Sequence, residues 1–218
     1  MAQLTWDKTE NHLYETGVSK GVLFPYSTNK YGAGVAWNGL ISVSESPSGA
    51  EETALYADNK KYLSLMSVEE FGATINAYTY PDEFKPCIGE AELGVGVSYG
   101  QQAHTKFAFS YQTKIGSADN NNLGYKIHIV YGALAAASEK EYSTVNDSPE
   151  AMEMSWEITT TPVKVSDGVY TSCIVIDSTK VDAEKLTAIE AKLYGTEDEE
   201  PTLLMPEDIK EILEGAAA

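Results

Sequence analysis

A two-residue alternation of apolar and polar side chains recurs along this sequence and limits the folds open to it. Successive side chains of a β-strand point to opposite faces, so each alternating segment needs a sheet with one buried face. Such sheets are usually antiparallel. The pattern is clear in residues 105–113, 125–131 and 152–158, and 35–43, 71–80 and 170–176 are also strand-like. We therefore expect a mainly β protein with antiparallel pairing.

The segment 152–158 shows the alternation in its simplest form. Its two sides hold different chemistry: Met152, Met154, Trp156 and Ile158 on one, and Glu153, Ser155 and Glu157 on the other. The first side is predicted to face the core. The second must face water, another molecule or an enclosed channel.

Polar turn sequences separate the predicted strands. Residues 116–124 (GSADNNNLG) and the pair Asp167-Gly168 are typical of hairpin turns. Residues 44–62 are longer and have no clean period, and loops of this length in a compact domain are usually functional or disordered. This segment carries Pro47 near its start and an apolar patch, which is Ala54, Leu55 and Tyr56.

Helical signals are concentrated near the C-terminus. Asp182 can cap a helix over 182–194, and an apolar stripe recurs at helical spacing, formed by Leu186, Ile189 and Leu193. We expect this stripe to pack against the sheet. The acidic residues 196–201 (TEDEEP) are predicted to be a hinge. The hinge would lead a second short helix, 206–213, to a neighbouring molecule. The predicted organisation is a domain over 1–195 and an extension over 196–218.

Several kinds of chemistry have no support in the sequence. The chain has 33 acidic residues, 15 basic residues and a net charge of −18, which argues against a nucleic-acid binder held by a basic surface. The three histidines lack metal-site spacing, and no phosphate loop or nucleophile elbow occurs. We therefore expect no enzyme activity and no catalytic, cofactor or metal site.

The sequence contains few signals of cellular location. The first 13 residues have no apolar run typical of a signal peptide, and no apolar run is long enough to span a bilayer. Cys87 and Cys173 are expected to be free thiols in a chain that folds in a reducing cytoplasm. No membrane partner is expected.

Several stretches, taken in order, resemble the major tail protein, or tail tube protein, of long, flexible-tailed bacteriophages. They are 17–25 (GVSKGVLFP), 31–48 (YGAGVAWNGLISVSESPS), 56–59 (YADN), 69–84 (EEFGATINAYTYPDEF), 124–132 (GYKIHIVYG), 142–163 (YSTVNDSPEAMEMSWEITTTPV) and 176–195 (IDSTKVDAEKLTAIEAKLYG). The C-terminal residues 203–213 depart from the pattern.

The resemblance implies an antiparallel β-sandwich or barrel-type tail tube fold with a flanking C-terminal helix. It implies six copies in a ring, rings stacked into a tube around a tape measure protein, and tail terminator and distal tail or baseplate proteins at the tube ends. The location implied is the virion tail, after assembly in the bacterial cytoplasm. Duplex DNA would pass through the lumen without specific binding.

Two groups of residues acquire candidate roles from this resemblance. The segment 44–62, with Pro47, Ala54, Leu55 and Tyr56, becomes a candidate ring-stacking loop that is mobile in the free chain and ordered between rings. Glu153 and Glu157 become candidate lumen-facing residues. DNA carries one negative charge per ~1.7 Å of axis, so lumen carboxylates repel it and let it slide.

Two other functions remain open at this point. One is the tube of a phage-tail-like bacteriocin or contractile injection machine, which neighbouring sheath genes without capsid genes would favour. The other is an acidic β-sandwich binding module for carbohydrate or adhesion. That module would expose several aromatic side chains on a polar strand face, whereas Trp37 and Trp156 fall on apolar faces.

Overall fold

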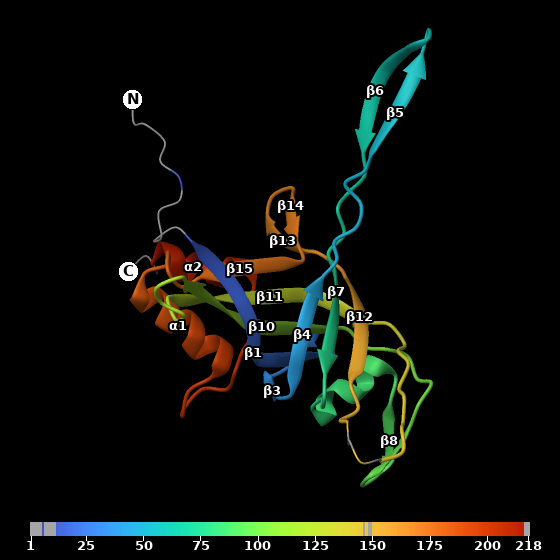
Figure 1. Ribbon diagram of the computed structural model, residues 1–218, viewed down its shortest axis with the longest axis vertical. Coiled ribbons are helices and arrows are strands. Elements are labelled where there is room, and N and C mark those ends of the chain that lie inside the picture. The colour runs from blue at the N-terminus through green and yellow to red at the C-terminus, as the bar shows by residue number, and fades with distance from the viewer. Residues whose placement is uncertain (1–5, 7–11, 146, 148–149, 216–218) are drawn as a thin grey trace.

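The computed structural model describes residues 6, 12–145, 147 and 150–215. Its strands form a nine-stranded antiparallel sheet and three separate two-stranded hairpins, with two helices beside the sheet (Figure 1). The mainly β, antiparallel prediction with a C-terminal helix is confirmed. Among the described residues, no hydrogen-bonded strand pair closes the sheet into a barrel.

The large sheet supplies both layers of a sandwich. One layer contains β1 (Leu13–Ser27), β2 (Lys30–Tyr31), β3 (Val35–Trp37), β10 (Phe107–Ser117), β11 (Gly124–Ala135) and β15 (Cys173–Asp177). The other layer contains β4 (Leu40–Glu45), β7 (Gly72–Ala77) and β12 (Met154–Thr160).

The two layers are joined through β11. Its first half pairs with β15 and its last residues pair with β12. The change of partner falls at Gly132, which has φ 58°. A Cβ there would lie 2.3 Å from the carbonyl oxygen of Thr161, so only glycine permits this close approach.

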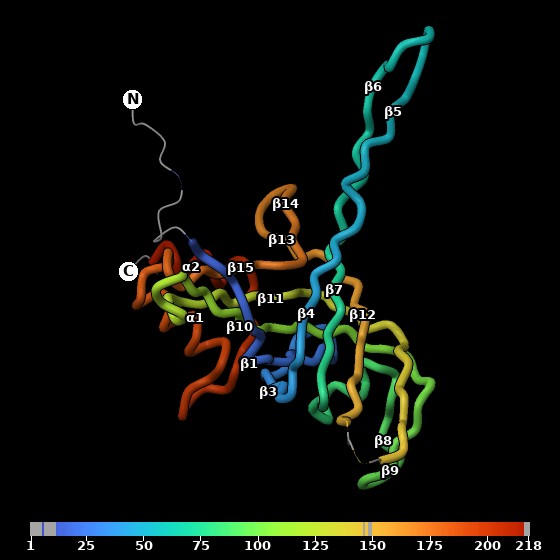
Figure 2. The backbone as a smooth tube through the Cα atoms, viewed as in Figure 1, coloured from blue at the N-terminus to red at the C-terminus, as the bar shows by residue number. Residues whose placement is uncertain are grey.

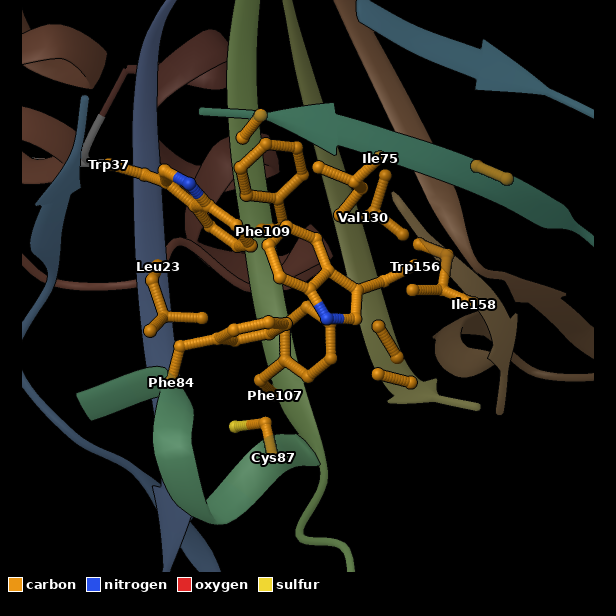
Figure 3. Packing of buried hydrophobic residues seen from close by; sticks show 14 of the residues in the cluster. Leu23, Trp37, Ile75, Phe84, Cys87, Phe107, Phe109, Val130, Trp156 and Ile158 are labelled. Atoms are coloured by element: carbon orange, nitrogen blue, oxygen red, sulfur yellow. The ribbon is translucent and has the colours of Figure 1, made fainter. Parts of the chain in front are cut away.

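An aromatic cluster fills the space between the layers (Figure 3). Trp156 on β12 keeps 1% of its surface exposed, and its ring lies 5.2 Å from that of Phe84 and 5.7 Å from that of Trp37. Phe84 comes from the 3-10 helix η2 (Asp82–Ile88), which covers one end of the cluster. Burial of aromatic rings at such spacings stabilises the sandwich.

A second core lies on the other face of the β10–β11 pair. The helices α1 (Ala183–Tyr194) and α2 (Pro206–Glu214) cover it (Figure 1). Cross-strand pairing puts Phe109 beside Val130 on the sandwich side and Ser110 beside Ile129 on the helix side. The alternation predicts a single buried face for residues 105–113. That prediction is wrong, because Ser110 and Gln112 on the polar side are buried below the helices.

The helix predictions over 182–194 and 206–213 are confirmed. The Asp182 side chain accepts a hydrogen bond from the backbone N–H of Glu184. Ile189 and Leu193 are fully buried, while Leu186 is half-buried at the edge of the same core. Gly195 has φ 78° and ψ 172°, so it ends the helix in an extended conformation with positive φ.

The prediction of a hinge over 196–201 is not supported by the packing. The backbone N–H of Gly34 donates to the Pro201 carbonyl at 2.9 Å, and the Tyr131 hydroxyl donates to the Leu204 carbonyl at 2.8 Å. Leu203, Leu204 and Ile209 are buried in the second core. The extension therefore completes the core of its own chain, and the division at residue 195 does not separate two packing units.

Two predicted strands are divided in the structure, and one long strand was not predicted. The predicted strand over 35–43 is two strands, because Gly39 with φ 80° turns the chain from one layer to the other. The segment 170–176 also divides, into β14 (Val169–Thr171) and β15, around Ser172. The alternation did not predict β1, because two register shifts near Ser19 break its period.

Candidate functional site

A long ribbon leaves the sandwich as a continuation of β4 and β7 (Figure 1). The backbones of Ser48 and Glu70 exchange hydrogen bonds at 2.9 and 2.8 Å, and the Ser67 N–H donates to the Glu51 carbonyl at 3.1 Å. The hairpin of β5 (Glu52–Ala57) and β6 (Lys60–Met66) follows. We call residues 48–70 the arm; its two segments cross each other between the sandwich and the β5–β6 hairpin (Figure 2).

Two local features give the arm its shape. Gly49 has φ 87°, and a Cβ there would lie 2.3 Å from the Val68 carbonyl oxygen, so the base of the arm requires glycine. At the tip, Asp58 and Asn59 have φ 50° and 60°. Positive φ at both central residues is the conformation of a tight two-residue hairpin turn.

The arm exposes apolar side chains on both of its faces. Register places Leu55, Leu63 and Leu65 on one face, and alternation places Tyr62 and Met66 on the other. Tyr56, Tyr62 and Met66 each keep 73% of their surface exposed. A two-stranded hairpin is marginally stable alone in water, and apolar patches of this kind mark interaction surfaces.

The structure divides the candidate stacking residues between the base and the hairpin. Pro47 lies just before the arm, and Ala54, Leu55 and Tyr56 lie on β5. The prediction that 44–62 lacks regular structure is wrong, because 52–57 and 60–66 are paired strands. Sequence reasoning missed the partner strand β6, although the Asp58-Asn59 turn pair was a usable signal.

Glu157 lies on the outward face of the second layer, as the alternation predicts. It pairs with Thr74, and the neighbouring Ser155 pairs with Asn76, whose amide donates to the Ser42 hydroxyl at 2.8 Å. Glu153 is exposed just before β12. We call this surface of β12, β7 and β4 the acidic face. None of the three strands contains a lysine.

A compact polar cluster occupies one end of the sandwich. The Tyr111 hydroxyl donates to Glu45 Oε1 at 2.6 Å, and the Tyr111 ring stacks on His128 with centroids 4.5 Å apart. His128 Nε2 lies 3.4 Å from Glu15 Oε1. Burial raises the pKa of Glu15, but hydrogen bonds from Lys126 and Thr113 outweigh it and leave that pKa below its ordinary value. The cluster ties β1, β4, β10 and β11 together.

The two cysteines are free, as predicted. Burial raises the pKa of Cys87 to about 11 and that of Cys173 to about 12, so both are almost entirely protonated at neutral pH. No group of three or more His, Cys, Asp or Glu in the described part of the chain could hold a metal ion. Within the same residues, none of the helices has the length and apolar character of a membrane span.

Comparison with protein-family models gives no match for this sequence, and comparison with curated proteins gives none either.

Proposed function

We propose that this chain is a structural protein of a virion, the subunit of a phage tail tube. Copies of it form hexameric rings, and the rings stack around a tape measure protein. The observation that carries the proposal is the arm, a ribbon joined to the sheet by backbone hydrogen bonds, with exposed apolar side chains on both faces that no described residue of the chain covers. A partner that buries both faces must surround it, as the adjacent ring of a tube would.

The body and the arm have properties that suit this role. The sandwich has a complete core without the arm, so the folded subunit is available for assembly. The arm continues the β4–β7 ladder, so a load on the arm passes directly into the sheet. Terminator and distal tail or baseplate proteins would cap the same contacts at the two tube ends.

The acidic face supports a role as the channel wall. Glu157 pairs with Thr74 beside the Ser155–Asn76 pair, Glu153 is exposed just before β12, and no lysine lies on these strands. Carboxylates in a lumen repel phosphates, whereas lysines release counterions and hold DNA. Only side chains within about 8–10 Å of the DNA act strongly at physiological salt, so this face would have to line the lumen directly.

Electron microscopy of the purified chain tests the proposal. Hollow tubes or six-fold rings at high protein concentration are the expected result. A strictly monomeric species at all concentrations contradicts it and favours the binding-module alternative. A bacteriocin tube subunit would form the same tubes. Neighbouring genes distinguish the two functions, since sheath genes without capsid genes would favour the bacteriocin.

A matched charge change tests the channel assignment. The double variant Glu153→Lys, Glu157→Lys should still form tubes, because both side chains are exposed, but should slow genome ejection most at low salt. The control is Glu197→Lys with Glu199→Lys, the same change in charge on the exposed loop after α1. Equal slowing by both pairs contradicts the assignment of this face to the lumen.

A further inference from the structure

The strand β4, which leads into the arm, ends on a carboxylate that faces the body. Glu45 lies opposite Ala73, a fully buried core residue of β7. Directly opposed residues of an antiparallel pair project to the same side of the sheet, so the Glu45 side chain points towards the other layer. The next residue, Ser46, donates its backbone N–H to the Gly72 carbonyl at 2.8 Å, where the ladder of the arm begins. We call residues 45–48 the root of the arm.

Two stacked rings of the first layer meet this carboxylate. The Tyr111 hydroxyl on β10 donates to Glu45 Oε1 at 2.6 Å. His128 on β11 places its Nδ1 3.5 Å from the same oxygen. The Tyr111 and His128 rings are nearly parallel, with an angle of 5° between their planes, and His128 is buried. The root of the arm therefore contacts the opposite layer through one carboxylate oxygen.

The hydrogen bonds around His128 assign the position of its proton in the neutral ring. Thr113 donates its single hydroxyl hydrogen to Glu15 Oε1 at 2.5 Å, so its oxygen accepts from the His128 Nε2–H at 3.1 Å. A neutral imidazole carries only one N–H, so Nδ1 presents a lone pair to Glu45. Among the described residues, no hydrogen-bond partner satisfies this buried Nδ1. In the neutral state, two acceptors therefore face each other at the root of the arm.

We propose that His128 is a proton-dependent link between the body and the root of the arm. A proton on Nδ1 makes it a charged donor, and its contact with Glu45 becomes a charge-assisted hydrogen bond. The link is present in mild acid and is lost as the pH rises and the proton leaves. The inference concerns the single chain, so it does not depend on the tube function or on what the arm contacts.

The other charged or titratable groups around His128 come from the strands packed about it. They are Glu15, Glu45, Tyr111, Lys126, Cys173 and Asp177. Burial raises the pKa values of Glu15 and Asp177, but hydrogen bonds outweigh it and leave both below their ordinary values. The hydrogen bond to Glu15 raises the pKa of Lys126. Burial raises the pKa of Tyr111, and that of Cys173 to about 12. Histidine is the side chain that ordinarily changes charge between pH 5 and 8, which makes His128 the candidate switch.

Amide hydrogen exchange at the root of the arm tests the link. Protection factors for the Ser46 and Ser48 N–H groups are measured on the dilute monomer at about pH 5.5 and about pH 7.5, above the ordinary titration of glutamate. We expect opening to be about threefold rarer at the lower pH, because a partly exposed ion pair is weak. The Ser67 N–H, which donates to the Glu51 carbonyl further along the arm, should change less. Equal protection at the two pH values, or an equal change at Ser67, overturns the proposal.

Two substitutions locate the effect. His128→Gln removes the titrating ring, and Glu45→Gln removes the charge that it faces, so each should abolish the pH difference at Ser46 and Ser48. Glu45 is partly exposed, so its variant should fold, and nuclear magnetic resonance should still show the His128 ring titrating in it. His12→Gln, at an exposed histidine, is the control and should keep the difference. Survival of the difference in either of the first two variants, or its loss in the control, overturns the proposal.

Discussion

The β10–β11 pair and the arm are both antiparallel hairpins, yet they have opposite surroundings. The β10–β11 pair is covered on one face by the second layer of the sandwich and on the other by two helices. The described residues cover neither face of the arm, although it carries leucines, tyrosines and a methionine. The same side-chain types are buried and stabilise the fold in one region and stay exposed in the other. Burial, rather than composition, separates the stabilising strands from those that we propose for assembly.

The largest effect expected from this comparison is on folding stability. Trp156→Ala removes a fully buried ring and should lower the free energy of unfolding by about 3–5 kcal/mol. Tyr56→Ala on the arm should change it by less than about 0.5 kcal/mol. Denaturant unfolding of the dilute monomer measures both values. A large loss for Tyr56→Ala would show that the arm packs on its own chain.

The helix α1 gives a graded version of the same test. Leu193→Ala should cost about 2–5 kcal/mol, because Leu193 is fully buried. Leu186→Ala should cost less, about 1–2 kcal/mol, because this side chain is half-buried. Equal costs measured by denaturant unfolding would mean that both leucines are equally enclosed, for instance by a neighbouring chain.

Loss of one buried hydrogen bond should weaken the docking of the C-terminal extension on its own chain. Tyr131→Phe leaves the Leu204 carbonyl without the donor that lies 2.8 Å away, and an unpaired buried acceptor costs about 1–3 kcal/mol. Amide hydrogen exchange should increase over residues 203–213, with little change in β7 and β12. Unchanged exchange in the extension would contradict its docking on this chain. Tyr170→Phe, on an exposed hairpin, is the control.

The smallest expected effect is a pH dependence from the polar cluster. The pKa of Glu15 lies below its ordinary value of 4.5 in the folded chain, so its contribution to stability is present above pH 4.5 and is lost as pH falls through the folded-state pKa. Glu15→Gln should remove up to about 1 kcal/mol at neutral pH, and the gap from the native protein should close in acid. Thermal melts of both proteins at several pH values measure this gap, and a gap that stays constant in acid would contradict the role given to Glu15.

Local patterns were sufficient to predict much of this fold. The strict alternation in 152–158 places Trp156 in the core and Glu157 outside, because β12 is covered on one face only. The capping residue and apolar spacing place α1 within a residue of its observed start. For strands with one covered face and helices with clear capping residues, the local sequence is enough to predict the structure.

The remaining features depend on contacts far apart in sequence. Ser110 is buried below helices that lie some 80 residues later in the sequence. The local sequence pattern around Ser110 cannot predict this contact. Residues 44–62 were expected to be a loop, because the strands of the arm are exposed on both faces and so lack alternation.

The arm itself provides the most direct test of the central claim that its exposed apolar faces exist to contact other copies. Replacing residues 50–68 with Asn-Gly closes the Ser48–Glu70 ladder with a two-residue turn and leaves both cores intact. Electron microscopy of native and shortened proteins at equal concentration is the measurement. The account predicts stacked tubes from the native chain, and single rings or monomers with a native melting temperature from the shortened one. Normal tubes from the shortened chain would contradict it.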